Sequence, residues 1–65
     1  MISNRPLWTT LHDAGVDVLD MCHDAGLSPA TLEKLNRDES VELSIIANIC
    51  CVLGCEVEDV VKIVV

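Results

Sequence analysis

The chain has 65 residues, enough for one small domain around a single core and too few for a second domain. Hydrophobic residues make up 51% of it, but Trp8 is the only aromatic residue, so we expect an aliphatic core. The first residues lack the charged and apolar regions of a signal peptide, and no apolar stretch reaches the roughly 20 residues that span a bilayer. We therefore expect a cytoplasmic protein with no membrane partner.

Acidic residues dominate the charge of the chain, with a formal net charge of −7. This is unusual for a protein that binds nucleic acid, because Lys and Arg side chains must neutralise the phosphates. Residues 28–37 are the exception, since Lys34 and Arg37 outnumber Glu33 there. A nucleic-acid-binding surface is therefore expected only in this middle stretch.

Capping residues and apolar spacing predict two helices in the first part of the chain. Pro6 suits the first turn of a helix and Gly15 offers a stop, so the apolar residues between them predict a helix over about 6–14. Asp17 stands at an N-cap position ahead of a second apolar face, which predicts a helix over about 18–25.

A short turn separates this second helix from a third one. Gly26 can adopt the positive φ that the turn needs, and Leu27 is placed to enter the core. Ser28 and Pro29 supply a capping hydroxyl and a proline at the first helical position, which predicts a helix over about 29–36. Two short helices at this spacing are typical of a helix-turn-helix.

The last part of the chain contains one clear helix and one ambiguous segment. Apolar residues at helical spacing predict a fourth helix over about 43–53, which Gly54 ends. Residues 56–65 also have helical spacing, with acidic residues at their N-terminal end, and they predict a fifth helix. The run Val60–Val65 is rich in β-branched residues as well, so an extended C-terminus is the alternative.

Short motifs along the chain match the pattern of a known family. They are Pro6-Leu7-Trp8, Ala25-Gly26-Leu27-Ser28, Thr31-Leu32, Lys34-Leu35, Ile49-Cys50, Leu53, Cys55 and Asp59-Val60. With them the chain resembles the small stand-alone transcriptional regulators of the XRE family, the Cro and phage-repressor type, over nearly its whole length. The resemblance implies a single all-α domain over residues 1–65, a compact five-helix lambda-repressor-like fold. It also implies a homodimeric repressor whose third helix enters the major groove of double-stranded DNA.

The resemblance further implies which residues face DNA. They are Ser28, Pro29, Ala30, Thr31, Lys34, Asn36 and Arg37. Pro29 and Ala30 cannot make bidentate contacts to bases, which leaves Lys34 and Asn36 for base edges. Thr31 is expected to contact a thymine methyl group or a phosphate.

The second helix departs from the family pattern. Members of this family tend to carry Lys, Arg, Gln or Thr at its start and outer face, whereas this chain has Asp17, Val18, Cys22, His23 and Asp24. Phosphate contacts there are expected to be lost or repulsive. An alternative function therefore stands beside the first: an acidic protein-interaction module that keeps the helix-turn-helix fold and has lost DNA binding.

The C-terminal segment has more apolar residues than one helical face can bury in so small a domain. Val60, Val61, Ile63 and Val64 are therefore expected to pack against a second copy of the chain.

The four cysteines are expected to be reduced, because nothing in the sequence directs secretion. Structural zinc sites take two ligand pairs from separate segments, and beyond Cys51 and Cys55 the chain offers no second pair at such spacing. We therefore expect no metal and no other cofactor. Cys22 and Cys50 fall on apolar faces, whereas an outward-pointing Cys51 is a candidate for a redox-sensitive or dimer-linking thiol.

His12 and His23 stand among acidic residues, which superficially suggests acid–base chemistry. No nucleophile or phosphate-binding loop accompanies them, and a helical domain of this size has little room for an enclosed substrate. We expect solvated surface residues, no enzymatic activity and no small-molecule substrate.

Overall fold

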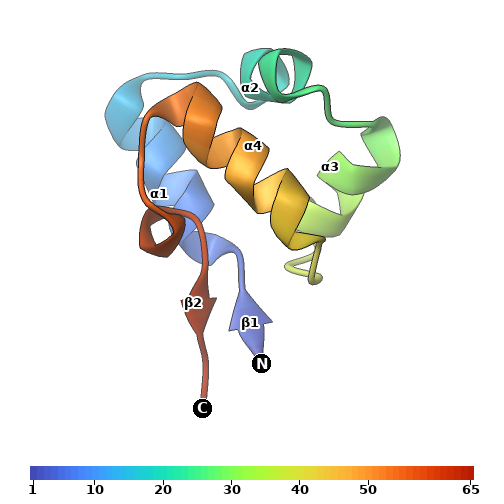
Figure 1. Cartoon of the computed structure of the whole chain (residues 1–65), viewed down its shortest axis with the longest axis vertical. Coiled ribbons are helices and arrows are strands. Elements are labelled where there is room, and N and C mark those ends of the chain that lie inside the picture. The colour runs from blue at the N-terminus through green and yellow to red at the C-terminus, as the bar shows by residue number, and fades with distance from the viewer.

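Four α-helices and a two-stranded sheet make up the fold (Figure 1). In the computed structural model, which describes residues 1–65, the helices are α1 (Arg5–Ala14), α2 (Val18–Ala25), α3 (Pro29–Asn36) and α4 (Leu43–Leu53). The remaining elements are the strands β1 (Ile2–Ser3) and β2 (Lys62–Ile63) and a single 3₁₀ turn, η1 (Val57–Asp59). None of the helices has the length and apolar character needed to cross a bilayer.

The four predicted helices are confirmed, but the prediction of a fifth helix is wrong. After η1 the chain becomes extended, and β2 pairs with β1 in antiparallel orientation, with Ile2 opposite Ile63. The Val64 N–H adds a hydrogen bond of 2.8 Å to the Met1 carbonyl. The β-branched residues at the C-terminus favour this extended backbone, and the N-terminal segment supplies the partner strand that an isolated pattern does not reveal. The two termini consequently lie close together (Figure 1).

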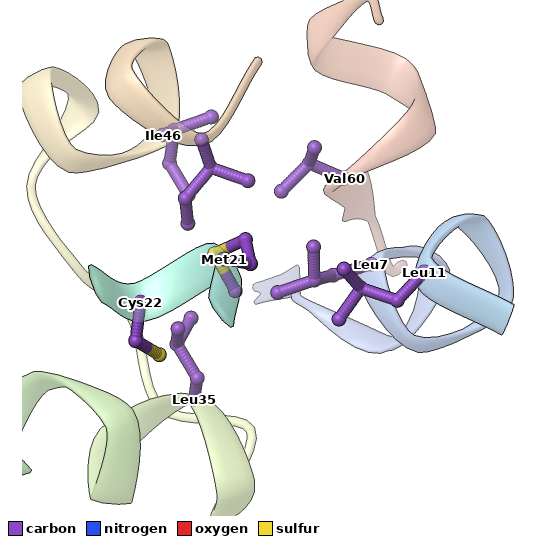
Figure 2. Close-up of a cluster of buried hydrophobic side chains, with 8 residues drawn as sticks. Leu7, Leu11, Met21, Cys22, Leu35, Ile46 and Val60 are labelled. Atoms are coloured by element: carbon purple, nitrogen blue, oxygen red, sulfur yellow. The ribbon is translucent and has the colours of Figure 1, made fainter. Parts of the chain in front are cut away.

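The core is aliphatic, as the composition predicts, and it forms where the four helices and the C-terminal segment meet (Figure 2). Its buried members are Leu7, Leu11, Met21, Cys22, Leu35, Ile46, Ile49 and Val60. Trp8 is only partly buried and packs at the edge of this cluster. Of the helix pairs, α2 and α4 contact each other most extensively, so α4 is the main support of the helix-turn-helix.

Val60 belongs to this core and not to the outer surface, which corrects its predicted place in a dimer interface. Its side chain is fully buried, and its carbonyl accepts a hydrogen bond of 3.1 Å from the Leu7 N–H at the start of α1. The bend after η1 turns Val60 inward, which helical spacing could not anticipate. Val61 is half-buried, whereas Ile63 and Val64 remain exposed.

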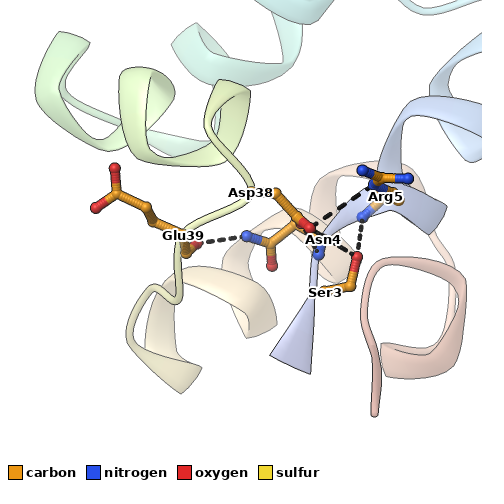
Figure 3. A network of polar contacts seen from close by, with 5 residues as sticks. All are labelled: Ser3, Asn4, Arg5, Asp38 and Glu39. Atoms are coloured by element: carbon orange, nitrogen blue, oxygen red, sulfur yellow. Dashed lines mark hydrogen bonds and ion pairs between the residues drawn. The ribbon is translucent and has the colours of Figure 1, made fainter. Parts of the chain in front are cut away.

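A buried polar network joins the N-terminal segment to the loop between α3 and α4 (Figure 3). The Asp38 carboxylate accepts hydrogen bonds from the Asn4 N–H at 2.6 Å and from the Ser3 hydroxyl at 3.0 Å. The Asn4 side chain donates to the Glu39 carbonyl at 2.6 Å, and the Arg5 Nε lies 3.8 Å from the Asp38 carboxylate. Ser3 and Asn4 are almost fully buried, so these bonds replace water that the two residues have lost.

Asp38 has a backbone φ of 58°, the left-handed region, which a short polar side chain tolerates better than most residues. We expect Asp38→Gly to lower the free energy of unfolding by about 1–3 kcal/mol, because it leaves the Asn4 N–H and the Ser3 hydroxyl without their acceptor. Glycine adopts the same φ without strain but gives the unfolded chain more conformational freedom, so the contribution of the side chain is read by comparison with a second variant at this position. The measurement is a urea titration followed by circular dichroism.

The matched control is Asp38→Asn, which keeps one acceptor oxygen and is expected to lose less stability than the glycine variant. A glycine variant as stable as the parent protein would show that the network does not hold the N-terminal segment.

Candidate nucleic-acid interface

The turn between α2 and α3 is built by local hydrogen bonds. Gly26 has a φ of 69°, and the Leu27 N–H after it donates to the Cys22 carbonyl at 2.9 Å, which closes the end of α2. Leu27 is half-buried and packs against the core. The turn is therefore fixed on its inner side, and it sets the direction in which α3 begins.

The start of α3 is organised by Ser28 and Thr31. The Ser28 hydroxyl accepts a hydrogen bond of 3.2 Å from the Thr31 N–H, and the two side-chain hydroxyls lie 3.0 Å apart. Pro29 occupies the first turn of α3, where a missing N–H costs nothing. The predicted capping role of Ser28 is confirmed by this geometry.

The outer face of α3 is free of contacts with the core. Leu35 is fully buried and Leu32 half-buried, and these two anchor the inner face. Six of the predicted site residues are exposed and only Thr31 is half-buried; the exposed ones are Ser28, Pro29, Ala30, Lys34, Asn36 and Arg37. The structure thus brings these residues to the surface along one short helix and the residue that follows it.

The predicted pair of base-reading residues does not share one side of the helix. Consecutive residues of an α-helix are rotated by about 100°, so Lys34 and Asn36 project in nearly opposite directions. Ala30 precedes Lys34 by one turn and shares its side, and Lys34 is rotated by about 100° from the buried Leu35. Lys34 and Asn36 therefore lie at the two flanks of the outer face.

Glu33 also lies on this face, although the sequence did not predict it as a site residue. It is exposed, and its carboxylate forms an ion pair with Arg37 four residues later. Arg37 also lies 3.8 Å from the Glu39 carboxylate. The spacing of Glu33 from Pro29 and Arg37 was the available signal, since residues four apart lie on one side of a helix.

Lys34 is the only cation within α3 and forms no ion pair, whereas Arg37, directly after the helix, pairs with carboxylates. The Arg37 pair is solvent-exposed, with 65% of the arginine side chain and 60% of the Glu33 side chain accessible. An ion pair in such a setting contributes well under about 1 kcal/mol, so Arg37 can exchange Glu33 for another anion.

The start of α2 has the opposite character. The Asp17 carboxylate accepts a hydrogen bond of 2.8 Å from the Leu19 N–H and so occupies the positive end of the helix. Leu19 itself is 65% exposed. The protein's own Asp17 carboxylate therefore occupies the end of α2. In the family pattern described above, this is the end that contacts DNA phosphates.

The helix-turn-helix formed by α2, the turn and α3, packed on α4 in an all-helical core, is the architecture of a DNA-binding domain. The chain belongs to the family of Cro/C1-type HTH DNA-binding domains, whose model matches residues 6–65. This confirms the resemblance found in the sequence. A comparison with curated proteins gives no match.

Among solved structures, the chain is similar to the crystal structure of the transcriptional regulator VanUg, Form II. The two superpose with a TM-score of 0.89 at 30% sequence identity, over 94% of this chain and 81% of that one. The likeness extends beyond the helix-turn-helix to almost the whole fold.

The capping role of Ser28 at the start of α3 can be tested by a measurement of stability. Ser28→Ala should lower the free energy of unfolding by about 1 kcal/mol, because the Thr31 N–H loses its acceptor. Ser44→Ala is the matched control, since the Ser44 hydroxyl is exposed and only touches the Glu42 carboxylate at 3.4 Å. Equal losses in the two variants, measured by urea titration, would contradict the capping role.

Proposed function

We propose that the protein is a sequence-specific transcriptional repressor that binds double-stranded DNA as a homodimer, with α3 in the major groove. The observation that carries this proposal is the exposed outer face of α3 in a chain whose family is defined by DNA binding. Its neighbour in structure is a transcriptional regulator, which supports the regulatory role. Repression is the proposed sign of regulation because a small domain that occupies a promoter blocks access to it.

The proposal assigns roles in DNA binding to several residues in and directly before α3. Lys34 donates to the acceptor atoms of a guanine in the major groove, and Ala30, one turn earlier, lies where it contacts a thymine methyl group. Asn36 reaches a base or a phosphate from the flank of the helix. Ser28 and Thr31 offer hydroxyl groups to a phosphate at the start of α3, beside the backbone N–H groups of its first turn.

Glu33 and Arg37 act as a pair in this account. Arg37 releases Glu33 and binds a backbone phosphate, because a charge-assisted bond to phosphate is stronger than an exposed ion pair. Glu33 is then free to accept a hydrogen bond from the amino group of a cytosine. The Glu33 carboxylate also repels any DNA arrangement that would bring a phosphate next to it, which adds to the specificity for one DNA sequence.

The acidic charge predicts an unusual balance between specific and non-specific binding. Each phosphate contact by Lys or Arg contributes about 0.9 to the slope of log affinity against log salt. With Lys34 and Arg37 as the only cations near α3, few phosphates are neutralised, and Asp17 repels others. Non-specific affinity should consequently be low, and discrimination has to come from base contacts.

Lys34→Ala should weaken binding to the preferred duplex by about 1–3 kcal/mol and relax the preference at one base position. Asn48→Asp is the control, because Asn48 is exposed on α4 outside the helix-turn-helix and the change lowers the net charge by the same one unit. Both variants have the same net charge, so a general charge effect would weaken them equally. The measurement is selection of bound duplexes from a randomised library at low salt, followed by titration. Failure of the parent protein to enrich any motif would overturn the proposal.

The acidic interaction module is the second candidate function, and two observations favour it: the net charge of −7 and the Asp17 carboxylate at the end of α2. Such a module would repel duplex DNA at low salt and bind a basic protein surface instead. A DNA-binding protein behaves in the opposite way, since its affinity is greatest at low salt and falls as salt is added. Salt dependence therefore separates the two candidates.

We propose that the homodimer forms through the surface around β2. An open apolar groove of about 640 Å³ lies there, lined by Ile2, Leu43, Val57, Val61 and Ile63 together with Glu56, Glu58 and Lys62. The charges at this groove are self-complementary, because in a two-fold contact Lys62 of each copy can face the acidic residues of the other. The two short strands also leave open edges on which a second copy can pair.

Ile63→Asp should raise the dissociation constant of the dimer at least tenfold, because Ile63 is 79% exposed at the groove and a charge there opposes apolar burial. Leu19→Asp introduces the same change on an exposed leucine outside the groove and should leave self-association unchanged. Sedimentation equilibrium measures both. A parent protein that stays monomeric at high concentration would contradict the dimer.

A further inference from the structure

Three helices of the fold end in the same backbone motif. In α1, α2 and α4 a glycine in the left-handed region follows the last helical residue, and the next N–H bonds back to a carbonyl five residues earlier. The bonded pairs are Val16 with Leu11 at 3.0 Å, Leu27 with Cys22 at 2.9 Å and Cys55 with Cys50 at 3.1 Å. This pattern is the Schellman motif, in which the side chains of the two bonded residues lie on the same side of the helix end and frequently make contact.

At the end of α4 both members of this pair are cysteines. In α1 and α2 the bonded pair consists of a core residue and an apolar residue packed against the core, whereas in α4 it consists of Cys50 and Cys55. Both thiols are half-buried and pack against the core, so solvent reaches them from one side. All four cysteines of the chain are free thiols in this structure.

The direction in which the pKa of Cys50 is shifted agrees with a position beside Cys55 at the edge of the core. Burial raises the pKa of the Cys50 thiol, and the next causes are the charge of Cys55 and a side-chain hydrogen bond with it. Cys51 and Glu56 raise this pKa further through their charges. Cys55 raises the pKa of Cys50 more than the adjacent Cys51 does, although it lies five residues away in the sequence.

We propose that Cys50 and Cys55 form a redox modification site, in which an intramolecular disulfide closes across the C-terminal end of α4. The oxidant is a small-molecule disulfide of the glutathione type. The thiolate of one cysteine attacks this disulfide and releases one equivalent of small thiol, which gives a mixed disulfide. The thiolate of the other cysteine attacks the protein sulfur and displaces the second equivalent, so two protein thiols are oxidised and one disulfide is reduced to two thiols.

Cys51 and Cys22 are not the partners in this reaction. Cys51 is exposed on the next position of α4, so it projects to a different side of the helix from Cys50. Cys22 is buried at the end of α2, where its contact across the motif is Leu27. The redox role considered for Cys51 from the sequence is thus assigned to the neighbouring pair.

The disulfide would fasten α4 to the segment that leads to η1 and to the buried Val60. Since α4 is the main support of α2, the modification reinforces the base of the helix-turn-helix without touching the exposed face of α3. The ring is small, so the entropic gain is modest, and we expect a higher melting temperature in the oxidised protein that reductant reverses.

The test is oxidation of the full chain with oxidised glutathione, followed by mass spectrometry. The Cys51→Ser protein should lose two hydrogen atoms and carry no glutathione, with the change confined to the tryptic peptide Asp38–Lys62 that contains Cys50 and Cys55. Cys50→Ser and Cys55→Ser in the same background should instead retain one glutathione on the remaining thiol of that peptide. A Cys51→Ser protein that keeps two glutathiones there, or forms linked dimers, would overturn the proposal.

A second measurement tests whether the folded structure speeds disulfide formation beyond what the short separation of Cys50 and Cys55 in the sequence would give. The mixed disulfide should resolve about tenfold faster or more in the native protein than in urea, because the folded motif holds the two sulfurs near each other. Equal rates in the two conditions would show that the motif does not prepare the pair. The reaction should also accelerate as pH rises, because the thiolate is the attacking form, and burial and Cys55 raise the pKa of Cys50.

Discussion

The hydrogen bonds to the Asp38 carboxylate are the constraint on which the arrangement of this small domain depends. They join the N-terminal segment to the loop that leaves α3, two parts of the chain that are 34 residues apart. By fixing Asn4 they fix the start of α1, and by holding Ser3 they present β1 to β2. The cost of the left-handed φ at Asp38 is offset by the polar groups that its side chain satisfies. An interior with so few large side chains gains order from this polar junction.

The domain combines a DNA-binding architecture with an acidic surface. The cations are few, and they differ in availability: Arg5 and Arg37 lie beside carboxylates, whereas Lys34 and Lys62 have no such partner. Asp17 uses the positive end of α2 for its own capping bond. A protein of this kind cannot depend on general attraction to phosphates, so the proposed function requires a small number of directed contacts from α3.

Local signals explain why much of the fold could be predicted from the sequence. The bounds of α2, α3 and α4 follow from capping side chains and stop signals close by in the chain, such as Asp17, Ser28 and Gly54. The pairing of β1 with β2 and the inward turn of Val60 depend on contacts between the two ends of the chain, and strands of two residues have no periodicity to read. For the candidate site, exposure could be anticipated from the sequence. Helical spacing also contained the signal for Glu33 and for the opposite directions of Lys34 and Asn36, whereas the ion pair of Glu33 with Arg37 is seen only in the structure.

The most direct test of the account is to map the DNA-contacting face by nuclear magnetic resonance, with the amide signals assigned and a selected duplex added at low salt. The account predicts that the largest shifts fall on the first turn of α3 and on Lys34 and Arg37, while the strands β1 and β2 stay unchanged. Shifts centred on the apolar groove beside β2, or no shifts at all, would contradict the claim that α3 is the surface with which this chain reads DNA.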